Sequence, residues 1–300
     1  MPSCQGVTGI TCEVWLISGL GYRLIRVCAG LSGSGCVFFS YLFLFCSGPT
    51  TAALPDEADL TAEEYGLAVF READRRGAGY VDLQANLEMI LRNSRGRESR
   101  RLLRIKQLEI PADGDKLLIV FDTPKSLKGS ALLSFSHKVE PDDQWLFLPA
   151  IKRVKRIASR NKSGPFLSSE FAFEDLTLQE VEKFTYRFLR REILDGRECF
   201  VVQRKAVGKY SGYSKQVVWM DTEAFRIQQI EYFNRREELM KTLKVEGYTQ
   251  YNSRFWKADR MLMVNHQTGK STELVWRDYR FATGLSDERD FSTNSLRRVR

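Results

Sequence analysis

Residues 81–92 read VDLQANLEMILR, and apolar and polar side chains alternate through most of the stretch. Successive side chains of a β-strand point to opposite faces, so this pattern predicts a strand with one apolar and one polar face. Apolar or alternating runs recur at 102–110, 116–122, 131–139, 145–151, 184–188, 199–207, 217–220, 225–233, 239–251, 255–266 and 272–281. Turn signals such as Asp113-Gly114 and Asp195-Gly196 separate these runs, and short connections predict an antiparallel meander.

About ten strands that are each apolar on one face cannot form a flat sheet in water. They must close into a barrel, pair as a sandwich or curl around something. Upstream of the strands, residues 61–75 are predicted to form an amphipathic helix, which Thr61 and Glu64 begin with a capping box. A short helix is also expected within 286–296.

The N-terminal stretch has the organisation of a secretory leader. Arg23 and Arg26 precede an uncharged run at 27–47, and small residues follow at 50–53. A basic region, an apolar core and a small-residue site are typical of a cleaved signal peptide, so we expect a leader over 1–53 and one domain over 54–300. An uncleaved membrane anchor is the alternative, because the run approaches the roughly 20 residues that span a bilayer.

Charge and cysteine content narrow the classes of function. The formal net charge of +8 favours anionic partners, but the chain has no nucleic-acid-binding module. Cys4, Cys12, Cys28, Cys36 and Cys46 lie in the expected leader, which leaves Cys199 for the domain. A lone cysteine forms no intramolecular disulfide, and no metal-ligand spacing is present, so we expect no metal site and no cofactor.

Catalysis is not indicated by the sequence. His137 and His266 are the chain's histidines, and no motif of a hydrolase, nucleotide-binding enzyme or metalloprotease is present. His137 falls on the apolar face of its expected strand, where a core histidine is the favoured interpretation.

A transmembrane β-barrel is the other alternative, and the charges argue against it. The apolar faces of the expected strands are interrupted by charges that the lipid-facing band of such a barrel would not tolerate, namely Arg190, Lys205, Glu231, Lys241, Lys257 and Asp259.

Large apolar side chains on the expected strands could line a cavity for an apolar ligand. Such cavities need mainly an apolar lining and a few polar groups at the mouth. The candidates are Phe135, Trp145, Phe147, Leu148, Phe184, Phe188 and Trp219. The alternative is that these side chains fill the core.

Residues 143–159, DQWLFLPAIKRVKRIAS, join an apolar strand to a basic one. The basic strand contains Lys152, Arg153, Lys155 and Arg156, which are candidates for docking a lipid headgroup or a partner protein. The alternative is a solvated strand face whose cations pair with acids on a neighbouring strand, such as Glu170 or Glu174.

Residues 143–176, with the segment RGRESRRLLRIK at 95–106, resemble the LolA-like outer-membrane lipoprotein-sorting protein family. The resemblance extends from about residue 79 to 295. It implies a mainly β (α+β) fold, in which a strongly curved antiparallel sheet forms an incomplete barrel with an N-terminal helix and few lid helices. It also implies a periplasmic location and an apolar cavity that shields acyl chains.

Together these observations predict a non-catalytic periplasmic carrier, which shields lipid or lipoprotein acyl chains on the way to the outer membrane. Its expected partners are those acyl chains, an inner-membrane lipid exporter and an outer-membrane acceptor, with no nucleic acid, and we expect a monomer. The alternative hypothesis is a periplasmic interaction or scaffold protein of the same fold, whose core is filled and which docks through the basic strand.

Overall fold

The structure is a computed structural model and describes residues 15–16, 23–24 and 54–298. The chain divides into two compact units, residues 1–51 and 52–300. In the first unit, β1 (Trp15–Leu16) pairs with β2 (Arg23–Leu24) in antiparallel register. The remainder of the expected leader over 1–53 lies outside the described residues.

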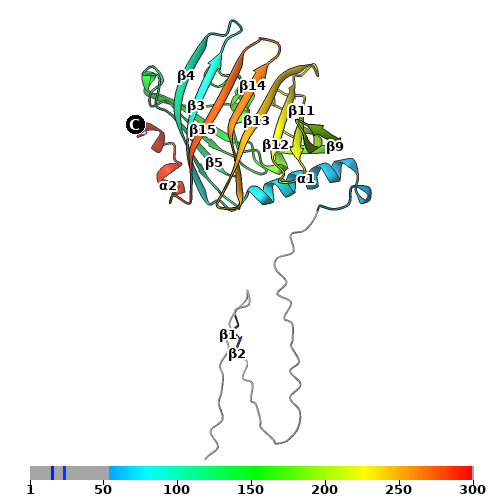
Figure 1. Cartoon of the computed structure of the whole chain (residues 1–300). Helices are drawn as coiled ribbons and strands as arrows, with labels where there is room; N and C mark the ends of the chain where they lie inside the picture. Colours follow the sequence, from blue (N-terminus) through cyan, green and yellow to red (C-terminus); the bar gives the residue numbers. More distant parts are fainter. Residues whose placement is uncertain (1–14, 17–22, 25–53, 299–300) are drawn as a thin grey trace, which may run out of the picture. The chain divides into compact units, whose positions relative to one another are not determined.

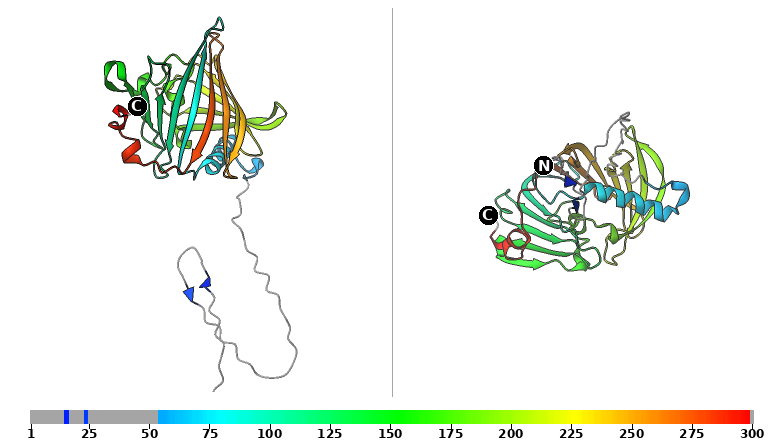
Figure 2. Two further views of the ribbon diagram at one scale, coloured as in Figure 1. Left: turned by 60° about the vertical axis from the view of Figure 1, so that its left-hand side comes forward. Right: turned by 90° about the horizontal axis from the view of Figure 1, so that it is seen from below.

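The second unit is built on one antiparallel sheet of 13 strands, which is strongly curved and does not close (Figures 1 and 2). Its strands are β3 (Asp82–Arg92), β4 (Glu98–Leu108), β5 (Lys116–Phe121), β6 (Ala131–Phe135), β7 (Asp143–Leu148), β8 (Arg153–Arg156), β9 (Phe184–Leu194), β10 (Arg197–Ala206), β11 (Lys215–Asp221), β12 (Ile227–Phe233), β13 (Leu239–Tyr251), β14 (Phe255–Asn265) and β15 (Ser271–Phe281). The order across the sheet is β8-β7-β6-β5-β4-β3-β15-β14-β13-β12-β11-β10-β9. The expected meander and incomplete barrel are therefore confirmed.

β8 and β9 follow each other in sequence but form the two opposite edges of the sheet. Residues 157–183, which we call the crossing segment, connect these edges and must pass across the concave face. The segment contains short 3-10 turns at η3 (Ser159–Asn161), η4 (Phe173–Leu176) and η5 (Val181–Lys183). It buries Phe166, Phe171 and Leu176 in the main hydrophobic core, so part of the concave face is filled by the chain itself.

The expected N-terminal helix is α1 (Ala62–Gly77), and the capping box between Thr61 and Glu64 is present. Seen from below, α1 lies across the opening of the curved sheet (Figure 2, right). Its aromatic side chains pack on β9: the ring centroids of Tyr65 and Phe188 are 4.9 Å apart, and those of Phe70 and Tyr186 are 4.5 Å apart. The amphipathic pattern of the helix thus fixes its place against one edge of the sheet.

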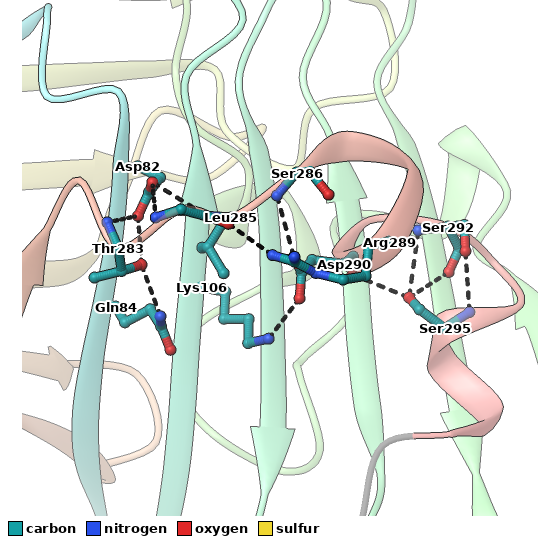
Figure 3. Close-up of polar contacts among 11 residues, drawn as sticks. Asp82, Gln84, Lys106, Thr283, Leu285, Ser286, Arg289, Asp290, Ser292 and Ser295 are labelled. Atoms are coloured by element: carbon teal, nitrogen blue, oxygen red, sulfur yellow. Dashed lines mark hydrogen bonds and ion pairs between the residues drawn. The ribbon is translucent and has the colours of Figure 1, made fainter.

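The C-terminal residues pack on the convex face, where Phe291 and Leu296 join the outward side chains of β5, β6 and β7. This segment contains α2 (Asp287–Asp290) and η6 (Ser295–Arg297). Figure 3 shows how it is held: the carboxylate of Asp82 accepts hydrogen bonds from residues 283–285, and Lys106 Nζ lies 2.8 Å from Asp290 Oδ1. Polar contacts therefore fix the end of the chain beside β3 and β4.

Three details differ from the sequence-based expectations. The strand expected over 145–151 ends at Leu148, because Pro149–Ile151 forms the 3-10 turn η2 and Lys152 adopts a left-handed backbone with φ of 49°. His137 lies in the loop after β6 and not on a strand, with Nδ1 2.5 Å from Asp113 Oδ2. The expected C-terminal helix is a single turn, α2.

Gly66 allows the close approach of α1 to β9, because a Cβ there would lie 2.8 Å from the backbone nitrogen of Phe188. We expect Gly66→Ala to destabilise the protein by about 1–3 kcal/mol through overpacking. Gly77→Ala is the matched control, because a Cβ at Gly77 meets nothing within 4 Å. Thermal unfolding followed by circular dichroism should show a lower midpoint for Gly66→Ala alone. Equal midpoints for the two variants would contradict the packing described here.

Candidate functional site

The structure separates the candidate ligand-lining residues onto two faces of the sheet. Leu148, Phe184 and Phe188 belong to or pack against the main core on the concave face. Phe135, Trp145 and Phe147 pack on the convex face beneath the C-terminal segment, and Trp219 lies in a further convex cluster with Cys199. Neighbours in a strand point to opposite faces, which is why Phe147 and Leu148 are separated.

The candidate docking residues Lys152, Arg153, Lys155 and Arg156 lie at and just before the edge strand β8, and all are exposed. Arg156 forms an ion pair with Asp143 on the adjacent strand β7. The acids considered as partners are engaged elsewhere. Glu170 Oε2 accepts a hydrogen bond of 2.7 Å from Asn265, and Glu174 accepts from the Gly212 N–H and the Ser211 hydroxyl. The basic strand therefore presents most of its charge to solvent.

A cavity of about 620 Å³ lies between the end of α1, the start of β3, strands β13 to β15 and the crossing segment. We call it the helix-side cavity. Aromatic and aliphatic side chains make up much of its wall: Tyr80, Leu83, Ile110, Leu178, Tyr248, Trp256, Ala258, Met261, Trp276 and Tyr279. An apolar ligand portion placed here would be removed from water, which is favourable in proportion to the apolar area buried.

Acidic side chains also line the helix-side cavity, and two of them organise the backbone around it. Glu109 accepts hydrogen bonds from the N–H groups of Gly79 (2.6 Å) and Val81 (3.0 Å). Asp115 accepts from the Tyr80 hydroxyl at 2.9 Å and from the Ile110 N–H at 2.8 Å. Burial raises the pKa of both Tyr80 and Asp115. These two carboxylates thus hold the start of β3 and the β4–β5 loop in place.

Lys257 and Glu180 are further ionisable groups of the same cavity. The ammonium of Lys257 lies 4.9 Å from the centroid of the Tyr80 ring, and burial lowers the pKa of this lysine. Burial raises the pKa of Glu180 to about 7; the Asp115 N–H that donates to its carboxylate opposes this rise, while the charges of Asp115 and Asp74 add to it. The cavity thus combines an apolar wall with ionisable groups whose charge is disfavoured by burial.

A second cavity of about 490 Å³, the loop-side cavity, lies between the β6–β7 and β10–β11 loops and the crossing segment. Leu178 and Gln179 of the crossing segment contribute to the walls of both cavities. Of the candidate ligand-lining residues, Phe184 lines this cavity. Its rim includes Val139 and Val207, which are 85% and 65% exposed.

A buried polar network fixes the crossing segment to the concave face. Arg204 on β10 is 3% exposed and donates to Gln179 of the segment and, at 2.7 Å, to Gln216 on β11. The Tyr213 hydroxyl donates to the carboxylate of Asp175, and Lys241 donates to the Glu170 carbonyl oxygen at 2.7 Å. Buried polar groups are tolerated when they are hydrogen-bonded, so this network gives the segment a defined position.

The described residues contain no cluster of three or more His, Cys, Asp and Glu side chains that could hold a metal ion. Cys199 is buried, and burial raises the pKa of its thiol to about 11, so the group is un-ionised at neutral pH. His266 is exposed, and its Nε2 lies 2.7 Å from the Thr242 hydroxyl. Among residues 54–298, no helix has the length and apolar character needed to cross a membrane.

Sequence reasoning did not single out Tyr80, Asp115, Glu180 or Lys257 as site residues. Strand periodicity identifies apolar faces but does not show which loop and helix end meet at one opening. The available signal was the charge of Lys257 on the expected apolar face of its strand. A charge at such a position indicates either a structural ion pair or a polar contact with a ligand.

Glu180 should make stability depend on pH. Its pKa in the folded protein, about 7, is above the ordinary value of 4.5, so folding resists its ionisation and stability is lost as pH rises through this window. Glu180 is partly exposed, and solvent screening reduces the effect. We expect Glu180→Gln to raise the melting temperature at pH 8 by about 2–4 °C, and to leave it unchanged at pH 4.

Glu288→Gln is the control for this measurement, because Glu288 is an exposed carboxylate on the convex side of the molecule. Melting temperatures of the wild type and both variants at pH 4, 6 and 8 test whether folding disfavours the ionisation of Glu180. A gain from Glu180→Gln that is the same at every pH would show that its ionisation is not disfavoured by folding.

The fold matches those of known proteins. A family model described as "Uncharacterized protein" matches residues 113–298. Among solved structures, a domain provisionally described as an outer membrane lipoprotein-sorting protein from Vibrio parahaemolyticus is 48% identical, covers 78% of this chain and 99% of its own, and has a TM-score of 0.77. A DUF1329 family protein from Desulfovibrio piger is 25% identical, covers 79% of this chain and 100% of its own, and has a TM-score of 0.75.

A LolA superfamily protein from Nitrosomonas europaea shares the fold at 20% identity, covers 79% of this chain and 99% of its own, and has a TM-score of 0.62. No curated protein matches the chain. The family model spans more than half of the sequence, and the relative at 48% identity aligns over nearly its whole length. The chain therefore has the LolA-like fold and belongs to the outer-membrane lipoprotein-sorting protein family.

Proposed function

We propose that the protein is a periplasmic carrier that shields lipid or lipoprotein acyl chains in the helix-side cavity during transport toward the outer membrane. The observation that carries this proposal is the cavity of about 620 Å³ with a largely aromatic and aliphatic wall. Pockets of about 300–1,000 Å³ with apolar linings are typical of sites for small apolar ligands. The Vibrio parahaemolyticus relative and its provisional description as a sorting protein support the same class of cargo.

Binding would be driven by the removal of acyl methylene groups from water, at roughly 0.8 kcal/mol for each group. A carrier must also release its cargo, so an element at the opening has to move. The C-terminal end of α1 lines the cavity through Asp74 and Gly77, and the Arg76 guanidinium donates to the Glu223 carbonyl oxygen at 3.0 Å. We therefore assign the end of α1 as the lid, which a membrane partner would displace.

The cellular setting follows from the expected leader over 1–53 and from the family. The sorting relative supports a location in the cell envelope, and a cleaved signal peptide would deliver the domain over 54–300 to the periplasm. An inner-membrane lipid exporter would load a monomeric carrier, and an outer-membrane acceptor would unload it. The proposed role is non-catalytic and uses no cofactor.

Native mass spectrometry with lipid extraction tests the carrier hypothesis. Protein expressed from the full chain in a periplasmic host should carry co-purifying phospholipid or acylated protein. Leu178→Asp should lower lipid occupancy by about tenfold or more, because it places a carboxylate in the wall of both cavities, and a loss of 1.4 kcal/mol already has that effect. Leu189→Asp, at an exposed position of β9, is the control. Protein that stays free of lipid after incubation with lipid would refute the carrier.

The second candidate function is an interaction or scaffold protein, and it rests on a different observation. The crossing segment fills part of the concave face with Phe166, Phe171 and Leu176, while the cations of 152–156 are exposed at an open edge. In this hypothesis the basic strand docks an acidic partner, and the cavities hold no cargo.

Charge reversal distinguishes the two candidates. Replacing Lys152, Arg153 and Lys155 with Glu should abolish partner capture under the scaffold hypothesis and leave lipid content unchanged. These side chains are exposed, so the triple variant should fold with an unchanged melting temperature. Capture of envelope proteins by chemical crosslinking, with the wild type alongside, measures the effect. Undiminished capture would exclude docking through this strand.

A further inference from the structure

Lys257 is a cation in an apolar wall without a conventional partner. Within the part of the chain that the structure describes, its ammonium has a ring contact with Tyr80, at 4.9 Å from the centroid, and makes no hydrogen bond or ion pair. Lys257 is half-buried, and an unpaired ammonium costs more free energy the further it is removed from water, which is why buried charges are usually paired and hydrogen-bonded. The strand could hold an apolar residue here, so the position of this lysine calls for an explanation.

The carboxylates nearest to Lys257 are committed to other groups. The negative charges of Asp115 and Glu109 stabilise its protonated form, but Asp115 accepts from Tyr80 and Ile110, and Glu109 accepts from Gly79 and Val81. Their oxygens thus serve the protein's own backbone and the Tyr80 hydroxyl. All three N–H donors of the Lys257 ammonium therefore remain available to a ligand.

A second unused donor lies in the same wall. Trp276 on β15 lines the helix-side cavity, and its buried indole Nε1 has no hydrogen-bond acceptor in the structure. An indole N–H, like a lysine ammonium, only donates. Two donor-only groups on the adjacent strands β14 and β15 therefore lack acceptors. The indole N–H is buried, whereas the Lys257 side chain is partly exposed in the cavity wall, so it is the lysine that a ligand group can reach.

We propose that the helix-side cavity binds an amphiphile through its anionic group, a carboxylate or a phosphate, which pairs with Lys257 while the apolar chain lies against the aromatic wall. This inference rests on the carrier function proposed above and adds the chemical class of its cargo. The remaining charged groups of this cavity are Asp74, Glu109, Asp115, Glu180 and Lys138. Glu180 is half neutral near pH 7, which lessens the repulsion that an anion would meet at the opening.

Binding of three probes with one oleoyl chain type tests the proposal: oleate, dioleoyl phosphatidate and the uncharged monoolein. Full-length protein freed of endogenous lipid is titrated with each probe, below its critical micelle concentration for oleate and monoolein and from vesicles for phosphatidate. Lys257→Met should weaken binding of whichever anionic probe the wild type prefers by roughly 10- to 100-fold, the range expected for a charged hydrogen bond. Binding of monoolein should be unchanged. Oleate and phosphatidate distinguish a carboxylate head from a phosphate head.

Two controls separate this role from a structural one. Lys257→Arg keeps the charge and should retain preference for the anionic probe, while Lys270→Met removes an exposed cation on the β14–β15 turn and should change nothing. Since Lys257 is unpaired, Lys257→Met should melt at or above the wild-type temperature. A lower melting temperature would indicate a structural role and overturn the proposal.

The outcomes also separate this inference from the carrier function. If the wild type binds monoolein and both anions equally, and Lys257→Met behaves in the same way, the anionic anchor is refuted and the carrier stands. If the wild type binds none of the three probes, the carrier function fails, and the anchor fails with it.

Discussion

The constraint on which the rest of the structure depends is the position of β8 and β9. These strands are consecutive in the chain, yet they are the two edges of one sheet of 13 strands. Residues 157–183 must therefore cross the concave face, and a backbone that crosses a protein interior needs hydrogen-bond partners. Arg101, Gln144 and Lys241 of the sheet donate to its carbonyl oxygens at Leu167, Phe173 and Glu170. Arg204 binds the Gln179 side chain of the same segment, which explains why charged side chains occur within an otherwise apolar face.

The same crossing divides the space inside the curved sheet. Leu178 and Gln179 line both cavities, so this part of the crossing segment partly separates one cavity from the other. The crossing segment lies between the two edges of the sheet, and α1 covers one end of the opening. The helix begins with a capping box and packs on the sheet through Tyr65 and Phe70. Rigid support with a helix end at the opening suits the reversible binding of an apolar chain.

Periodicity predicted the strands, the antiparallel meander and the capped helix, because each depends on residues close in sequence. The curvature and the open edges of the sheet were predicted only from the resemblance to the LolA-like family. Which face of a strand is concave could not be predicted, since alternation shows only that neighbours such as Phe147 and Leu148 face opposite ways. Phe135, Trp145 and Trp219 thus lie in convex clusters. The ionisable groups of the helix-side cavity could not be predicted either, because they are brought together from 109–115, 180 and 257.

An unclosed sheet has a further consequence, because each edge strand leaves a row of backbone N–H and C=O groups unpaired. Such edges can recruit a strand from another copy and start polymerisation. In this protein β8 consists of Arg153, Val154, Lys155 and Arg156, and β9 carries exposed Arg187 and Arg190. Like charges would face one another if two such edges met, so the cations that suggest a docking surface also disfavour edge-to-edge pairing of two copies.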